Sequence, residues 1–230
     1  MTAPATELAT GRLAQRSVGR ATLIDAGVGN LGNLRRAFRA VGADVEVTAE
    51  PSAIRRSGCL VLPGVGAFRP PREVLRGALE EAIRGALADG AWLLGVCVGY
   101  QLLFESSEEF GTTDGLGLLD GSVVVLPATV PLPHIGWNRI QFERPAHALL
   151  DGIDDGAFMY FVHSFAPADV PVDTVVASCL HGRTFAAIAA RGRVLGTQFH
   201  PEKSGAPGLR LLANYLRLAA GAALGTAAGD

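Results

Sequence analysis

Residues 92–101 read WLLGVCVGYQ, and this stretch decides the fold. The apolar run of a buried strand ends at a Gly-x-Cys-x-Gly motif centred on Cys97, and a helical pattern resumes at once. Small residues on both sides of a nucleophile permit the tight strand-to-helix turn known as a nucleophile elbow. A thiol on such a turn points into open space, beside backbone N–H groups that favour negative charge. Cys97 is therefore a candidate nucleophile, whereas Cys59 and Cys179, each inside an apolar run, are expected to be core cysteines.

The composition favours one large domain in a reducing compartment. The chain has 230 residues, of which 49% are hydrophobic and 18% charged, enough to bury one substantial core. The formal net charge of -2 gives no electrostatic reason to expect nucleic acid or an acidic membrane surface as a partner. Three cysteines, an odd number without framework spacing, argue against a disulfide scaffold. No segment has the roughly eighteen uninterrupted apolar residues of a membrane helix, so we expect a soluble, cytoplasmic protein.

Three segments are expected along the chain. Residues 1–19 are rich in Ala and Thr and lack the continuous apolar stretch of a secretory signal, so we expect a disordered extension. Residues 20–220 are expected to form the single domain. Residues 221–230, rich in glycine and alanine, are expected to be a frayed tail.

Strand and helix patterns alternate in the first half of this domain. Strands are predicted at 21–24, 45–47, 59–62 and 92–97, and helices at 31–41 and 72–88. This rhythm predicts an α/β fold with a doubly wound, mostly parallel sheet and flanking helices. Further short strands, separated by Gly, Asp and Pro, predict additional antiparallel hairpins at 123–126, 158–162, 175–179, 185–189 and 194–199. A closing helix is predicted at about 207–218.

His200 is the best-placed candidate base for the thiol. It follows the predicted strand at 194–199, and parallel strands present their active residues at their carboxyl ends. If the turn is extended, the carboxylate of Glu202 reaches the imidazole N–H and fixes its tautomer. Spacing alone supports a solvated His-Pro-Glu surface turn equally well, because the apposition of His200 with Cys97 is not readable from one sequence.

Two loops could donate hydrogen bonds to an oxyanion, each contributing around 3 kcal/mol to transition-state stabilisation. The backbone N–H of Val98 directly follows the candidate nucleophile. The N–H of Val65, in the loop Pro63-Gly64-Val65-Gly66, is the second candidate, since glycines on both sides let its peptide flip. Taken alone, this loop is better explained as an ordinary glycine turn.

Several motifs in unbroken order resemble the class I (triad-type) glutamine amidotransferases, which have a flavodoxin-like core. The finer motifs resemble those of the glutaminase subunits of imidazole glycerol phosphate synthases in histidine biosynthesis. They are IDAGVGNL at 24–31, LPGVGAF at 62–68, QLLFE at 101–105, GLGL at 115–118, PHIGWN at 133–138, YFVHSF at 160–165 and QFHPEKSG at 198–205.

The resemblance implies hydrolysis of the glutamine side-chain amide. Cys97 would attack the amide, and His200 would protonate the departing ammonia and then activate water against the glutamyl thioester. Glu202 would orient His200, while the N–H groups of Val65 and Val98 would hold the oxyanion. The loop at 63–66 would have to reorient first, so glutamine hydrolysis would stay slow until the partner subunit has bound its ligand.

The resemblance also implies a substrate site, with no metal and no cofactor. L-glutamine would be held by Gly64, Gly66, Gln101, His163, Ser164 and Phe165. Without the family pattern, Gln101 is better explained as a solvated helix residue and His163 as a satisfied strand histidine.

A partner is implied as well: a (β/α)8-barrel cyclase subunit that forms a heterodimer with this chain. Ammonia would pass into it without meeting bulk water, yielding imidazole glycerol phosphate and an aminoimidazole carboxamide ribotide. His134, Trp137 and Asn138 would lie at the interface, although Trp137 could equally be a core anchor.

Two other functions remain open. A glutaminase that feeds another synthase, such as that for pyridoxal phosphate, is disfavoured because those relatives carry a second glycine and a Glu-Ser pair in the loop at 63–66. A non-catalytic binding module is compatible with the fold alone. The joint presence of Cys97, His200 and Glu202 argues against it.

Overall fold

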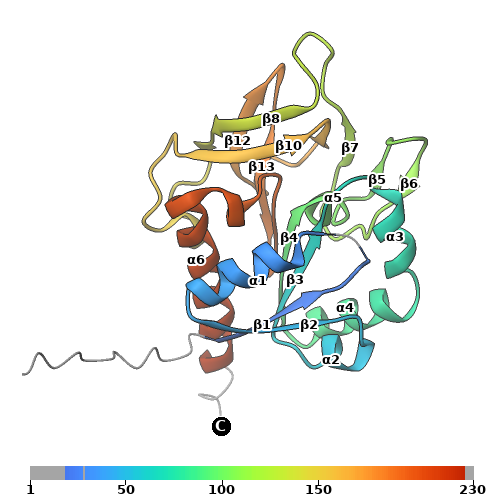
Figure 1. Cartoon of the computed structure of the whole chain (residues 1–230), viewed down its shortest axis with the longest axis vertical. Helices are drawn as coiled ribbons and strands as arrows, with labels where there is room; N and C mark the ends of the chain where they lie inside the picture. The colour runs from blue at the N-terminus through green and yellow to red at the C-terminus, as the bar shows by residue number, and fades with distance from the viewer. Residues whose placement is uncertain (1–18, 28, 226–230) are drawn as a thin grey trace, which may run out of the picture.

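The computed structural model describes residues 19–27 and 29–225 as an α/β fold around an eight-stranded sheet (Figure 1). The predicted extension at 1–18, residue 28 of the first glycine loop, and residues 226–230 of the predicted tail lie outside the described residues. Gly19 belongs to the sheet, because it pairs with Ala43, so the domain begins one residue earlier than predicted.

The main sheet is doubly wound and mostly parallel, as predicted. Its parallel strands, in spatial order, are β2 (Ala43–Thr48), β1 (Gly19–Ile24), β3 (Cys59–Gly64), β4 (Trp92–Cys97) and β14 (Val194–Thr197). Three antiparallel strands extend it: β13 (Arg183–Arg191), β12 (Val175–His181) and β9 (Gln141–Phe142). The strand order reverses between β1 and β3, since β1 connects outward to β2 while β3 connects in the opposite direction to β4.

Helices cover both faces of this sheet (Figure 1). They are α1 (Leu31–Ala40), α2 (Pro51–Arg55), α3 (Arg69–Leu75), α4 (Ala78–Ala88), α5 (Val98–Gln101) and α6 (Gly205–Gly225). Right-handed crossovers put α1 on one face and α4 on the other. Accordingly, α1 packs against α6, and α2 packs against α4. The side chain of Asn30 caps α1 by accepting a hydrogen bond of 3.2 Å from the Asn33 N–H.

Three predicted helices differ from the structure. The helix predicted at 72–88 is two helices, because Gly77 adopts a left-handed φ of 79° that separates α3 from α4. The helical pattern after Cys97 gives only the four residues of α5. The closing helix α6 begins at Gly205 and continues to Gly225, so the first five residues of the predicted tail are helical.

A four-stranded mixed sheet and a two-stranded antiparallel sheet lie beyond the carboxyl ends of the parallel strands of the main sheet. One contains β5 (Ser106–Ser107), β6 (Thr113–Asp114), β7 (Ser122–Val125) and β11 (Phe165–Ala168). The other is a ribbon of β8 (His134–Arg139) and β10 (Phe158–His163), which crosses the top of Figure 1. Strand β8 was not predicted. Two short 3-10 turns, η1 (Ala148–Leu150) and η2 (Pro201–Lys203), complete the described elements.

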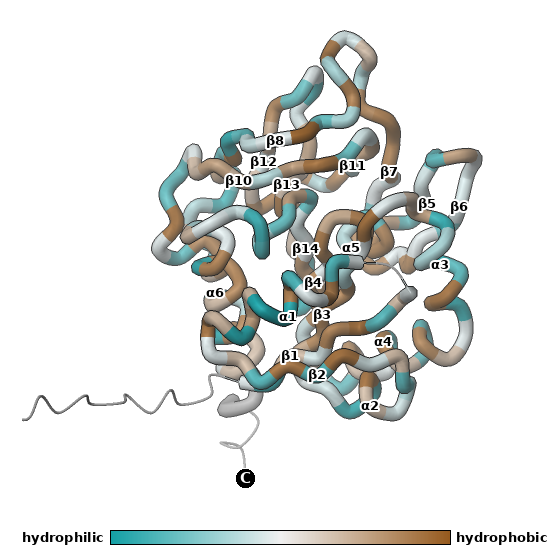
Figure 2. The backbone as a smooth tube through the Cα atoms, in the orientation of Figure 1, coloured by the Kyte–Doolittle hydropathy of each residue, from teal (hydrophilic) through white to brown (hydrophobic). Residues whose placement is uncertain are grey.

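The core lies between the main sheet and its helices, where the tube of Figure 2 is most hydrophobic along β1, β3 and β4. Cys59 and Cys179 are buried core residues, as predicted, and burial raises their pKa values to about 11 and about 12. Tyr215 is also fully buried, and its hydroxyl donates a hydrogen bond of 2.6 Å to the carbonyl of Leu60. None of the described helices combines the length and hydropathy that crossing a membrane requires.

Candidate active site

A cavity of about 730 Å³ opens at the carboxyl ends of four parallel strands. Asn30 follows β1, Val65 follows β3, Cys97 ends β4, and His200 follows β14, and all four line the cavity. In open α/β sheets, ligands bind outside the carboxyl ends of the strands, where the strand order reverses. The cavity therefore occupies the position at which this fold builds binding sites.

Cys97 sits on a strained elbow at the end of β4. Its backbone has φ 55° and ψ −111°, an uncommon conformation for a residue with a side chain. The turn is possible because its neighbours lack a Cβ: one on Gly99 would lie 1.8 Å from the carbonyl oxygen of Leu62, and one on Gly64 would lie 2.6 Å from the Gly99 nitrogen. The elbow predicted from the sequence is present.

The thiol of Cys97 is buried, whereas the elbow had predicted a thiol in open space. The residue is only 3% exposed, and it faces the cavity rather than the surface. The sequence could not reveal this because the cover comes from distant segments, among them the strands at 158–168. A substrate must therefore enter the cavity to reach the sulfur.

His200 and Glu202 form the predicted pair. The Nδ1 of His200 lies 2.8 Å from the Glu202 Oε1, and both side chains are almost completely buried. The turn between them is the 3-10 turn η2 rather than an extended one. Burial alone would lower the pKa of His200, but Cys97 and Glu202 outweigh it and raise this pKa to about 10. Within the described chain, Nε2 of His200 makes no hydrogen bond of normal geometry and remains free for a reacting group.

This raised pKa gives a pH dependence of stability that Glu202→Gln should weaken. The pKa of an unfolded histidine is about 6.5, so the stabilisation from protonated His200 is fully present below that pH. It is lost as the pH rises towards the folded pKa of about 10. We expect the free energy of unfolding, measured with urea at about pH 6 and about pH 9, to fall more in the wild type than in Glu202→Gln.

Cys59 and Cys179 also destabilise the fold at high pH, but equally in both proteins, so the difference isolates His200. An equal fall in the two proteins would contradict the assignment of the raised pKa to Glu202.

Most of the predicted substrate residues meet in the cavity. Its lining includes Val65, Gly66, Val98, Gln101, His163, Ser164 and Phe165. Gly64 is not among them, because it ends β3 and packs against the elbow beside Gly99. Its role is to permit close approach of the two loops rather than to line the cavity.

A chain of amide groups fixes the floor of the cavity. Gln101 is 3% exposed, so it is not a solvated helix residue. Its Nε2 donates to the Phe165 carbonyl at 2.8 Å and to Gln198 Oε1 at 3.2 Å. Gln198 in turn donates from Nε2 to the sulfur of Cys97 at 3.9 Å. With both amide hydrogens of Gln101 engaged, only its carbonyl oxygen is available to accept a hydrogen bond from a ligand.

A cysteine on a strained turn and a histidine held by a carboxylate, both lining one cavity, are the groups that cysteine-dependent acyl transfer requires. The glutamine amidotransferase class-I family matches residues 22–218. The chain belongs to this family.

Two curated relatives of this glutamine amidotransferase are subunits of imidazole glycerol phosphate synthases. The imidazole glycerol phosphate synthase subunit HisH of Symbiobacterium thermophilum is 44% identical over 86% of this chain and 94% of its own length. HisH of Caulobacter vibrioides is 46% identical over 84% of this chain and 96% of its own.

Solved structures agree on the fold. A putative GMP synthase protein from Thermoplasma acidophilum has a TM-score of 0.69 at 20% identity, covering 90% of this chain and 97% of that one. PurLQS from Thermotoga maritima has a TM-score of 0.69 at 17% identity, covering 87% and 98%. At these identities the likeness supports the fold alone.

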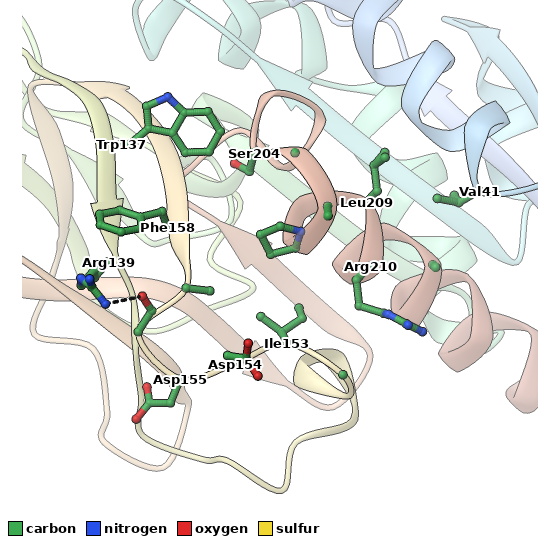
Figure 3. A pocket seen from close by; sticks show the side chains of 17 residues that line it. Val41, Trp137, Arg139, Ile153, Asp154, Asp155, Phe158, Ser204, Leu209 and Arg210 are labelled. Carbon is green, nitrogen blue, oxygen red and sulfur yellow. Dashed lines mark hydrogen bonds between the residues drawn. The ribbon is translucent and has the colours of Figure 1, made fainter.

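A larger cavity of this amidotransferase, about 1030 Å³, lies between the β8–β10 ribbon and the start of α6 (Figure 3). Trp137, Phe158 and Arg210 are among its lining side chains. Its described lining contains neither cysteine nor histidine, so it offers no thiol nucleophile with an imidazole base. The smaller cavity is therefore the better candidate for the active site of a glutamine amidotransferase.

Only part of the predicted interface set is on the surface of the amidotransferase. Strand β8 alternates, so His134 is 5% exposed and faces inward, while Trp137 is 55% exposed and faces out. His134 is thus not a surface residue, and Trp137 is not a core anchor. Ile135, 60% exposed on the same side as Trp137, was not predicted.

Several further residues belong to the site but were not predicted. Glu109, Phe110, Pro133 and Lys203 line the cavity, and Gln198 contacts the sulfur from beneath. Phe110 has a left-handed φ of 54° and is 82% exposed at the cavity. The signal for Gln198 was its position two residues before His200, directly after β14. No local pattern distinguished Glu109 or Phe110 from ordinary loop residues.

Proposed function

We propose that Cys97, His200 and Glu202 are the catalytic triad with which this chain hydrolyses L-glutamine. The chain is a glutaminase subunit of the imidazole glycerol phosphate synthase type, which supplies ammonia for histidine biosynthesis. One observation carries the assignment of the triad: the strained Cys97 elbow and the hydrogen-bonded His200–Glu202 pair open into one cavity.

The first half of the reaction forms a thioester. The sulfur of Cys97 attacks the carbon of the side-chain amide, and the carbonyl oxygen becomes an oxyanion. Val98 and Val65 both line the cavity. Their N–H groups would receive that charge, the latter after its peptide has turned. Protonated His200 gives its proton to the departing nitrogen, and ammonia leaves as the carbon–nitrogen bond breaks.

The second half restores the enzyme. His200, now neutral, takes a proton from water, and the hydroxide attacks the thioester carbon. The carbon–sulfur bond then breaks, glutamate is released, and the sulfur and His200 regain their starting protonation. Glu202 holds Nδ1 of His200 throughout, so that Nε2 faces the reacting groups.

The substrate is held by groups around the cavity. The carbonyl oxygen of Gln101 is suited to accept a hydrogen bond from the glutamine amide, because its own amide hydrogens are engaged in the protein. Backbone at Gly66, Ser164 and Phe165 lies along the same cavity and would bind the amino-acid end.

The partner in this proposal is a (β/α)8-barrel cyclase subunit that consumes the ammonia together with a ribulosyl-carboxamide nucleotide. Its products are imidazole glycerol phosphate and an aminoimidazole carboxamide ribotide. The exposed side of β8, with Ile135 and Trp137, supports a contact surface there, since two large apolar side chains lie together near the cavity. A cover over the cavity would keep ammonia from becoming ammonium in bulk water.

Glutamine hydrolysis by the purified chain, alone and with the cyclase, tests this function. We expect slow hydrolysis by the chain alone and by the complex, and a rise of about 10²-fold or more when the cyclase carries its nucleotide, since one oxyanion donor is worth that much. A cyclase without nucleotide is the control. Full turnover by the isolated chain would rule out the coupling, and no hydrolysis under any condition would rule out the glutaminase.

A further inference from the structure

Two buried histidines connect the active-site cavity to the β8–β10 ribbon. His134 and His163 lie directly opposite each other in the antiparallel pairing, and both are buried. The Nδ1 of His134 lies 3.1 Å from the Nε2 of His163. His163 lines the cavity, whereas His134 lies behind it. The triad mechanism uses neither ring.

The partners of these rings determine where each proton lies. His163 Nδ1 is 2.9 Å from the Phe165 carbonyl, which only accepts, so Nδ1 carries the hydrogen. At the other end, the Asn138 amide is fixed by two backbone groups. Its Nδ2 donates to the Leu180 carbonyl at 3.0 Å, and its Oδ1 accepts from the Arg139 N–H at 2.8 Å.

The same Asn138 Nδ2 lies 3.2 Å from the Nε2 of His134, so that ring nitrogen must accept. His134 therefore donates from Nδ1 to the Nε2 of His163. The hydrogen bonds between these groups all run in one direction. Asn138 donates to His134, His134 donates to His163, and His163 donates to the Phe165 carbonyl. A proton added to either ring would set one N–H against another, so both rings must be neutral. In agreement, burial, with a smaller contribution from neighbouring histidines, lowers the pKa of His134 to about 4 and that of His163 to about 3, and the hydrogen bond to Phe165 only partly opposes this for His163.

This series of hydrogen bonds ends at the Phe165 carbonyl, which also accepts a hydrogen bond from Gln101. The Phe165 oxygen accepts from His163 on one side and from Gln101 Nε2 on the other, at 2.9 Å and 2.8 Å. If the ring of His163 flipped, the Phe165 carbonyl would lose the hydrogen bond from Nδ1. The carbonyl would then no longer be held in place as the acceptor for Gln101. Gln101, which faces the substrate amide, is thus held through Phe165 and His163, and behind them by His134 and Asn138, which are not part of the cavity lining.

We propose that His134 and Asn138 are positioning residues of the glutamine site, which hold His163 as its Nδ1–H tautomer and thereby fix the Phe165 carbonyl and Gln101. The effect on glutamine binding rests on the proposed glutaminase function, whereas the tautomer assignment does not.

The tautomers are measured directly by 15N-edited NMR of imidazole nitrogens in the full chain, alone and with the cyclase. We expect His134 and His163 to be neutral Nδ1–H tautomers near neutral pH. Free histidine in water prefers the other tautomer, so this result is not the default. An Nε2–H tautomer or a charged ring for either residue would overturn the proposal.

Kinetics of the nucleotide-loaded complex test the consequence. His134→Phe keeps a ring in the stack between Phe161 and His181 but removes both nitrogens. We expect its KM for glutamine to rise about fivefold to tenfold, as for the loss of one buried hydrogen bond, with kcat within about twofold. His134→Gln, which offers a donor and an acceptor, should restore most of the lost affinity.

His181→Phe is the matched control, because His181 stacks on His134 at 4.0 Å but bonds only to the Pro131 carbonyl. Its KM should be unchanged. A rise in KM with His181→Phe equal to that with His134→Phe, or a fall in kcat alone with His134→Phe, would contradict a positioning role. If the wild-type complex hydrolysed no glutamine, the proposed function would fail while the NMR result still decided the tautomers.

Discussion

Cys97→Ala should abolish glutamine-dependent synthesis by the complex, with hydrolysis reduced by about 10⁴-fold or more. No other described side chain at the elbow can form the thioester, and removing a nucleophile from a triad costs a factor of this order or larger. The measurement is glutamate release with the nucleotide-loaded cyclase present. Synthesis by the complex supplied with free ammonia should continue at its wild-type rate, since that step does not use the thiol of Cys97.

Cys59→Ala is the matched control for this variant. Cys59 is also buried and also lies on the main sheet, but it sits at the start of β3, far from the cavity lining. We expect some loss of stability and little change in glutamine hydrolysis. Loss of both glutamine- and ammonia-dependent synthesis in Cys97→Ala would mean that Cys97 is needed for the complex to form rather than for chemistry.

Gly99→Ala should destabilise the fold more than any surface change. The added Cβ would lie 1.8 Å from the Leu62 carbonyl oxygen and 3.0 Å from the Pro63 carbonyl carbon, both of which are backbone atoms that cannot swing away. We expect a loss of about 3 kcal/mol or more in the free energy of unfolding, and a melting temperature lower by roughly 6 °C or more. Thermal unfolding followed by circular dichroism measures both.

Gly32→Ala is the companion substitution. Gly32 lies in α1, where an added Cβ meets no atom within 4 Å, so alanine should be neutral or stabilise the helix by up to about 1 kcal/mol. Similar melting temperatures for the two variants would mean that the backbone at Leu62 and Pro63 can move aside to accommodate the added Cβ. Close packing of this backbone against Gly99 would then not be needed to hold the elbow.

The parallel core could be predicted because its information is local. Strands β1, β3 and β4 contain short apolar runs, and helix α1, which begins at Leu31, shows its own period. Strand β8 could not be found in this way, because Gly136 and the preceding prolines mask its pattern, and its inward positions carry His134 and Asn138 rather than apolar residues. The break at Gly77 was hidden by apolar residues that keep their helical spacing across it.

The features of the site that depend on residues close together in the sequence could be predicted. The glycines around Cys97 and the spacing of His200 and Glu202 are readable in a single segment, and the His200–Glu202 hydrogen bond is present. The burial of Cys97 and the contact of Gln198 with its sulfur depend on segments distant in the sequence. The inward orientation of His134 follows from the phase of a strand that was itself not predicted.

The position of β14 between β4 and β13 has a consequence for biosynthesis of the protein itself. The ribosome makes Cys97 early, but His200 and Glu202 emerge only after the last strand, β14, in the turn before α6. Until then the main sheet is also split, since β4 has no neighbour on that side. A nascent or truncated chain that ends before His200 therefore carries Cys97 without its histidine partner. Glutamine hydrolysis therefore requires translation past Glu202 and closure of the main sheet by β14.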